Sequence, residues 1–112
     1  MAAGDKFVYS SQALLAADLV IFGASVLYLL TGHNPGADAY LLIFDDGSAP
    51  PLPNGTIPDQ SFPIPSGAEF SWAPSNGGRR FTNGIQYAVS STPEVLTASP
   101  VTVWVDVEGR EL

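Results

Sequence analysis

The sequence ends in an alternating run that strongly constrains its fold. From Val101 to Val107 a valine occupies every second position, with Thr102, Trp104 and Asp106 between them. Successive side chains of a strand point to opposite faces, so this period of two predicts a β-strand with one buried face. If the valines face the core, Trp104 is exposed in a single copy and is available to a partner or a ligand.

The same period occurs in two shorter segments. Segment 68–72 places Phe70 and Trp72 on one face, and segment 85–90 alternates in the same way directly after the turn pair Asn83-Gly84. Asn-Gly is a turn sequence that commonly precedes a strand. Both segments are therefore predicted to be strands.

Two earlier segments are apolar at both alternating sets of positions. Residues 25–31 and 39–44 have few polar side chains on either face. They predict strands that are either covered on both faces within the domain or partly covered by another subunit. The Gly- and Pro-containing residues 32–36 between them predict a hairpin loop.

The segment from Pro50 to Pro65 contains six prolines. Proline cannot donate a hydrogen bond to a ladder, so an extended connection or a sheet edge is expected, with a turn at Asn54 and Gly55. Phe62 and Ile64, which stand between prolines, are expected to anchor this segment to the core.

Eleven glycines and ten prolines in 112 residues exclude a helical bundle. Short strands separated by such turns predict an all-β chain with a single antiparallel β-sandwich of jelly-roll or immunoglobulin-like type. Residues 1–22 are expected to form an N-terminal arm and first strand, and residues 23–112 the sandwich. The arm is expected to be removable through residue 11 without unfolding the domain. Residues 7–9 remain open between a strand and an arm that reaches outside the domain, and residues 12–18 between helix and strand.

Charge excludes some functions and favours others. Four basic residues against eleven acidic ones give a net charge of −7, so nucleic-acid binding is not expected. The absence of cysteine excludes disulfides and thiolate metal sites. Only 13% of residues are charged, which favours a chain that completes its surface by packing against neighbours.

No segment predicts catalysis, a metal site, a cofactor or a membrane span. His33 lies in a turn-forming stretch, and Asp45-Asp46-Gly47 resembles part of a calcium loop but lacks its distal ligands, so a turn is the preferred interpretation. The apolar residues 13–30 are nearly as long as a membrane helix, but Asp18 interrupts them. We therefore expect a soluble protein that is not an enzyme.

Partner contacts are predicted at three places. The expected arm presents apolar and aromatic side chains, Trp104 falls on the face opposite the valines, and an adjacent arginine pair could meet an acidic patch on a neighbouring copy or simply be solvated. Alternatively, Trp72 or Trp104 could stack on a sugar. The predicted contact residues are Phe7, Val8, Tyr9, Arg79, Arg80 and Trp104.

From Gly23 onward, four stretches resemble a family of small virion proteins of tailed bacteriophages. They read VLYLLTGHNPGADAYLLIFDD, FPIPSG, AEFSW and GGRRFTNGIQYAVSSTPEVLTASPVTVWVDVE, and the last is the most specific. Residues 1–22 lie outside the resemblance, and Gly-His-Asn at 32–34 replaces a version that usually contains an aromatic residue.

The resemblance implies a non-enzymatic β-sandwich protein of the virion, made in the bacterial cytoplasm and attached to the capsid exterior as a decoration (cement) protein. The implied partners are the major capsid protein and other copies of the chain, with a trimer favoured. A tail or baseplate module and a carbohydrate-binding module for host recognition are the alternatives. The resemblance transfers no catalytic residue.

Overall fold

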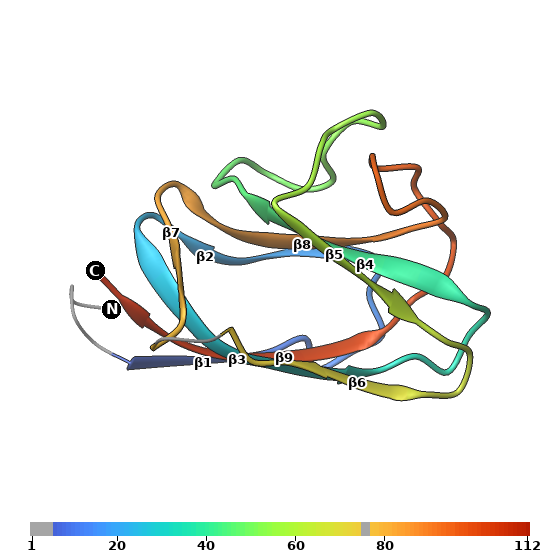
Figure 1. Cartoon of the computed structure of the whole chain (residues 1–112), viewed down its shortest axis with the longest axis horizontal. Coiled ribbons are helices and arrows are strands. Elements are labelled where there is room, and N and C mark those ends of the chain that lie inside the picture. Colours follow the sequence, from blue (N-terminus) through green and yellow to red (C-terminus); the bar gives the residue numbers. More distant parts are fainter. Residues whose placement is uncertain (1–5, 75–76) are drawn as a thin grey trace.

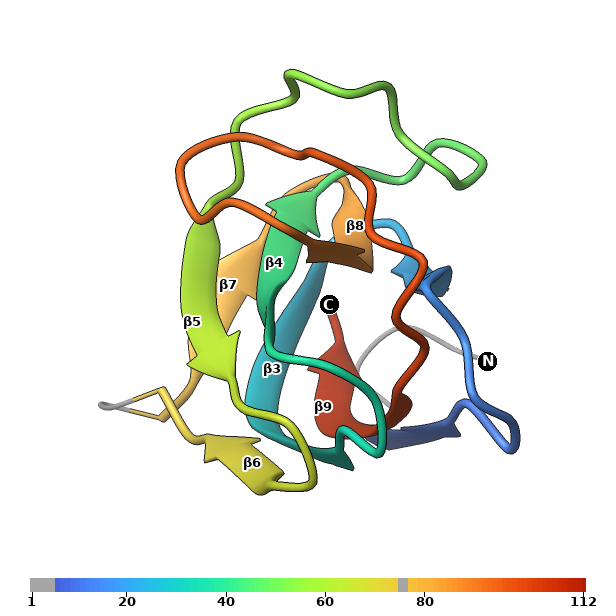
Figure 2. The same cartoon turned by 90° about the vertical axis from the view of Figure 1, so that its right-hand side faces the viewer.

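A computed structural model describes residues 6–74 and 77–112 of the chain. Nine strands in these residues form two antiparallel sheets that pack against each other, which confirms the predicted β-sandwich (Figures 1 and 2). None of the described residues forms a helix that is long and apolar enough to cross a membrane. The strands are β1 (Lys6–Ser10), β2 (Ala17–Phe22), β3 (Ser25–His33), β4 (Ala39–Asp45), β5 (Gln60–Ile64), β6 (Glu69–Trp72), β7 (Arg79–Phe81), β8 (Gly84–Ser90) and β9 (Trp104–Glu111).

The two sheets have different strand orders. Sheet 1 has the order β1-β9-β3-β6, and β7 also pairs with β3. Sheet 2 has the order β2-β8-β4-β5. Both sheets therefore combine strands that are far apart in sequence, and the core forms only when the two halves of the chain come together.

The core between the sheets follows the predicted alternation. In β9 the buried valines alternate with exposed or half-buried residues, and β3 and β6 contribute further buried apolar side chains. Aligned sandwiches bury the inward positions of both sheets in this way. The fully buried residues include Leu27, Leu30, Leu41, Ile43, Ile64, Phe81, Ile85, Tyr87, Val103, Val105 and Val107.

A second apolar cluster lies on the outer face of sheet 2. Leu42, Phe44 and Ala88 point away from the first core and pack against Leu52 and Leu96. These last two residues belong to the connections 46–59 and 91–103. The first connection and the beginning of the second lie on the far side of sheet 2, and the second then crosses to sheet 1, where Val103 joins the first core (Figure 1). The question left open for residues 39–44 is thereby answered, because the domain covers both faces of β4 itself.

The hairpin expected at residues 32–36 is not present. The strands β3 and β4 belong to different sheets, so the loop between them crosses from one layer of the sandwich to the other. Asn34 is buried there, and its side-chain amide donates hydrogen bonds to the backbone oxygens of Ala37 and Ile64 at 2.9 and 2.7 Å. The prediction was wrong because a Gly/Pro-rich loop also suits such a crossover.

The expected N-terminal arm is also corrected for the residues that the structure describes. The strand β1 pairs with β9, and β2 pairs with β8, so both are integral to the sandwich. The ring of Phe7 packs where Gly109 lacks a side chain, since a Cβ at Gly109 would lie 2.5 Å from that ring. Residue 22 therefore marks no boundary, and removal of residues 1–11 would take a buried side chain from the core; residues 1–5 lie outside the described part.

Two open assignments are settled. Leu15 makes an isolated β-bridge with Val103, and the chain around it contains no helix. The proline-rich segment contains both expected features, because residues 50–59 form a connection and β5 is the edge strand of sheet 2. Ile64 is fully buried and Phe62 packs against the core, as predicted for the two anchors.

Candidate functional site

The outer face of sheet 1 gathers residues from distant parts of the sequence. Opposite partners in an antiparallel pair share a face. The register therefore aligns Val8, Glu108 and Leu29 in one row, and Trp104 and His33 in another. We call this surface the open face, because each of its outward side chains is exposed or half-buried. They are Lys6, Val8, Ser10, Val26, Leu29, Thr31, His33, Glu69, Ser71, Arg80, Trp104, Asp106, Glu108 and Arg110.

Three of the six predicted contact residues meet on the open face. Val8 comes from β1, Arg80 from β7 and Trp104 from β9. Val8 is 77% exposed and Trp104 is 37% exposed, although both are apolar. Exposed apolar side chains that lie on one face indicate an interaction surface.

Trp104 is held in a defined orientation. Its indole Nε1 donates a hydrogen bond of 3.0 Å to Oδ2 of Asp106, the next outward residue along β9. Because the polar edge of the ring has a partner, the face of the indole is left for contact with another molecule.

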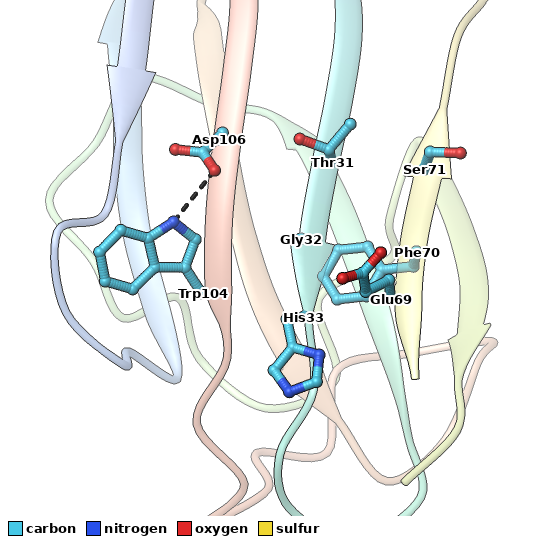
Figure 3. A pocket seen from close by; sticks show the side chains of 8 residues that line it. All are labelled: Thr31, Gly32, His33, Glu69, Phe70, Ser71, Trp104 and Asp106. Carbon is cyan, nitrogen blue, oxygen red and sulfur yellow. Dashed lines mark hydrogen bonds between the residues drawn. The ribbon is translucent and has the colours of Figure 1, made fainter. Parts of the chain in front are cut away.

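A hollow of about 400 Å³ lies at this end of the open face. Figure 3 shows Trp104 and Asp106 on β9 and the other lining residues on β3 and β6. At its floor, Gly32 gives room for the ring of Phe70, since a Cβ there would lie 2.3 Å from that ring. The hollow therefore combines the rings of Trp104 and Phe70 with several polar groups, among them Thr31, His33, Glu69 and Ser71.

Phe7 and Tyr9 do not belong to this surface. Phe7 is 4% exposed, and Tyr9 points inward on the same side of β1. The hydroxyl of Tyr9 donates to Asp18 on β2 and lies 3.1 Å from the hydroxyl of Tyr87 on β8. The three side chains therefore connect the two sheets at their β1 and β2 edges, which is a role in stability.

Burial changes the acidity of this tyrosine pair. It raises the pKa of Tyr9 well above the ordinary value of 10.0, and the hydrogen bond to Asp18 acts in the same direction. Burial also raises the pKa of Tyr87 to about 12. Both hydroxyls therefore stay protonated in the folded protein at neutral pH.

The two adjacent arginines point to opposite faces, as neighbours in a strand must. Arg79 lies on the inward side, where its guanidinium is 3.8 Å from Asp59 and stacks over Phe81 at 5.5 Å. Arg80 is exposed on the open face opposite Val26. Only the second arginine of the pair is therefore placed for a contact on this surface.

Of two other candidate residues, Trp72 faces the core and His33 is exposed. The ring centroid of Trp72 lies 6.2 Å from that of Phe62, so this residue offers no exposed platform for a sugar. His33 ends β3 and is exposed beside the hollow. Nothing in the sequence associates this histidine with Trp104, because their pairing depends on the register between β3 and β9.

The acidic turn after β4 is held by hydrogen bonds, as the turn interpretation expected. Asp45 accepts hydrogen bonds from the backbone nitrogens of Thr82 and Asn83, and Asp46 accepts them from Ser48. The bonds from the Ser48 hydroxyl and backbone lower the pKa of Asp46. Within residues 6–74 and 77–112, no three His, Cys, Asp or Glu side chains form a group suited to a metal ion.

Sequence reasoning missed most of the charged residues on the open face. Asp106, Glu108 and Arg110 occupy the same alternating positions as Trp104, so the period of two contained the signal for them. Lys6 and Glu69 could not be added from the sequence, because only the strand pairing places them on this face.

Comparison with known proteins adds no relative to this description. No family model, no curated protein and no solved structure matches the chain.

Proposed function

We propose that this chain is a non-enzymatic structural protein of a tailed-bacteriophage virion, and specifically a capsid decoration protein. The observation that carries the proposal is the contrast between the two outer faces. Over β4 and β8 the outer face of sheet 2 is covered by the chain's own loops, with Phe22 exposed at its β2 edge. The outer face of sheet 1 exposes Val8, Trp104 and Arg80, which the sequence had already selected as contact residues. The resemblance of residues 23–112 to virion proteins supplies the location.

The mechanism is non-covalent attachment in many copies. Each copy would bury apolar side chains such as Val8 and Trp104 against a neighbour, and the symmetry of the capsid would add many modest contacts together. The acidic remainder of the surface would oppose adhesion between finished particles and to nucleic acid. The partners in this proposal are the major capsid protein and other copies of the chain.

Attachment to capsids that lack the protein tests this function. The purified chain should co-sediment with such capsids and raise their resistance to heat, with on the order of hundreds of copies bound per particle. Saturation at a few to a few dozen copies would instead favour a tail or baseplate module. If the chain does not bind any particle of its phage, the proposal is wrong.

A second candidate function is sugar binding, which the hollow beside Trp104 favours. An exposed ring beside Thr31, His33 and Asp106 offers an apolar platform with hydrogen-bonding groups around it. Its volume of about 400 Å³ lies within the range of small-molecule sites.

Tryptophan fluorescence separates the two functions. For a sugar binder, Trp104 should remain accessible to a water-soluble quencher in the virion, and added oligosaccharides should protect it. For a decoration protein, capsid binding should shield it. The Trp104→Phe variant identifies the signal of this ring, because Trp72 is partly buried in the core.

A further inference from the structure

The open face carries an unusual share of the positive charge of this chain. Lys6, Arg110 and Arg80 lie in one row across sheet 1, because Lys6 pairs with Arg110, and Val26 pairs with both Arg110 and Arg80. All three cations are exposed. The whole sequence has four lysines and arginines, so three of them lie at one end of one face.

The negative charges of the same face lie away from that row. Glu69 is in the row of Trp104 and His33, which is six residues along β9 from Arg110 and therefore about 20 Å away. Asp106 and Glu108 occupy the two rows between. Three cations and three acids make the face neutral, which leaves eight acids and one cation to the rest of the sequence and hence its net charge of −7.

We propose that the open face pairs with the open face of a second copy, with the two sheets related by a half-turn about an axis across the strands. A half-turn of this kind reverses the strand direction, so the cationic row of each copy lies over the Glu69–Trp104 row of the other. At the outer edge Arg80 of one copy meets Glu69 of the second, because β7 and β6 pair with the same edge of β3.

A second copy fits this face better than a partner of one charge sign. An acidic partner would meet attraction at one end and repulsion at the other, whereas a copy turned end for end is complementary at both ends. Two chains of charge −7 repel each other in general, and the neutral face is where that repulsion is weakest. The pair is two-fold and isologous, so in this proposal a dimer contact takes the place of the trimer expected from the sequence.

Apolar side chains contribute in the same orientation. Val8 and Leu29 lie in a row between the charged ends, and Val26 lies within the cationic row between Arg110 and Arg80. The half-turn brings Arg110 of one copy toward the indole face of Trp104 in the other. A guanidinium over an indole ring is a favourable cation–π contact. The orientation fixed by the Trp104–Asp106 hydrogen bond leaves that indole face free.

Size and charge both predict that the contact is weak. The face spans about 19 Å across its four strands and about 20 Å along β9, so a pair buries an area at the low end for specific interfaces. The middle rows also bring Glu108 of one copy near Asp106 of the other. We therefore expect a dissociation constant on the order of 100 µM. The local concentration of copies on a particle surface would be high enough for pairing at that affinity.

Sedimentation equilibrium of the full chain tests the pairing without capsids. Between about 10 µM and 1 mM at low salt, the mass should rise from one copy toward two, and 0.5 M salt should weaken the association, since the screening length falls from about 10 Å at 0.1 M to about 3 Å at 1 M. Mass that stays at one copy, or that rises to three, overturns the proposal.

Charge reversal tests the orientation. Arg80→Glu and Glu69→Arg should each weaken pairing at least about tenfold, because the symmetry repeats every lost contact twice. The double variant Arg80→Glu/Glu69→Arg should restore most of it. Both residues are exposed, and thermal unfolding of each variant checks that the fold is kept.

Glu94→Lys is the matched control. It changes the net charge by the same two units as Glu69→Arg, but residue 94 is exposed in the connection that covers sheet 2. Pairing should be unchanged or tighter in this variant. Loss of pairing equal to that of Glu69→Arg would show that only net charge matters and would overturn the proposed contact.

The inference names the copy-to-copy contact of the proposed function, and the two can fail separately. Copies that pair in solution but do not bind capsids would leave the pairing and overturn the decoration role. If the chain binds capsids but stays monomeric in solution, and the charge reversals at residues 69 and 80 have no effect, the decoration role is supported and the proposed pairing is overturned.

Discussion

The outer faces of the two sheets differ in how far the chain's own loops cover them. On sheet 2, the connections 46–59 and 91–103 fold back and bury Leu42, Phe44 and Ala88 under Leu52 and Leu96. On sheet 1, the outward side chains remain exposed or half-buried, although Val8 and Trp104 are apolar. The chain thus covers the outer face of β4 and β8 itself, although Phe22 at the β2 edge stays 74% exposed, and it leaves the outer face of sheet 1 uncovered. This arrangement is expected when the open face has a binding role.

The difference also explains why both faces of β4 are apolar while β9 alternates. When both faces of a strand are buried, none of its side chains faces water, so apolar residues can occupy every position. In β9 only one face is covered, so valines alternate with Trp104, Asp106, Glu108 and Arg110. Single substitutions on these surfaces should therefore lower the free energy of unfolding by different amounts.

The largest loss is expected on the inner side of β1. Phe7→Ala should lower the free energy of unfolding by about 3–5 kcal/mol, because it leaves a cavity over Gly109 in the core. Chemical denaturation measures the change. A loss below 1 kcal/mol would mean that β1 is detached in solution, as the arm interpretation required.

The next largest loss is expected at the loop-covered face. Leu96→Ala should cost about 2–4 kcal/mol, since the side chain is 2% exposed and contacts the second apolar cluster, although a loop can relax around the cavity more easily than a strand. The same denaturation curves give the value. A near-zero cost would mean that the connections do not cover sheet 2, and the contrast between the two faces would disappear.

A moderate loss is expected where the two sheets are joined by side-chain hydroxyls. Tyr9→Phe removes the hydrogen bond to Asp18 and should cost about 1–3 kcal/mol at neutral pH. Tyr28→Phe serves as the control, because Tyr28 takes no part in the contact among Tyr9, Asp18 and Tyr87.

The same tyrosines predict an alkaline limit to stability. Their pKa values are raised in the folded state, so folding holds the proton more tightly than the unfolded chain does. The stabilisation is therefore complete below the unfolded value of 10.0 and is lost as the pH rises from 10 toward 12. Stability measured against pH should fall in this window, and less steeply in Tyr9→Phe; an equal fall in both proteins would contradict the assignment.

The smallest loss is expected on the open face. Val8→Ser should change stability by less than about 0.5 kcal/mol, because the side chain is 77% exposed and its removal leaves no cavity. The adjacent positions 7 and 8 thus differ by several kcal/mol on one strand. A loss at residue 8 that approaches the loss at residue 7 would show that the open face is covered in the isolated chain.

The predicted strands and the antiparallel β-sandwich were confirmed, whereas the prediction of which neighbouring strands pair as a hairpin was wrong. The alternation in β6 and β9 correctly separated buried from exposed side chains, whereas every residue of β8 is buried. Phe62 and Ile64 anchor the proline-rich segment as expected. The loop at 32–36 was misassigned because the residues that form a hairpin also form a crossover between layers. The choice between strand and arm for residues 7–9 could not be made, because Phe7 gains its burial from Gly109, which lies 102 positions later in the sequence.

For the candidate site, the sequence could select individual residues but not their shared location. Val8, Arg80 and Trp104 could be selected from the sequence, since each stood out by exposure on an alternating pattern or by charge. Their common location, and the row of cations opposite the acids, follow from the register among β1, β9, β3, β6 and β7.

By itself, the sequence determined the strand content, the buried side of each alternating strand and the shortage of charge. These are local properties, because they depend on the two-residue period of a strand and on composition. Only the tertiary structure decided which outer face the chain covers and which charges lie together, because loop closure and strand register depend on contacts between residues that are distant in sequence.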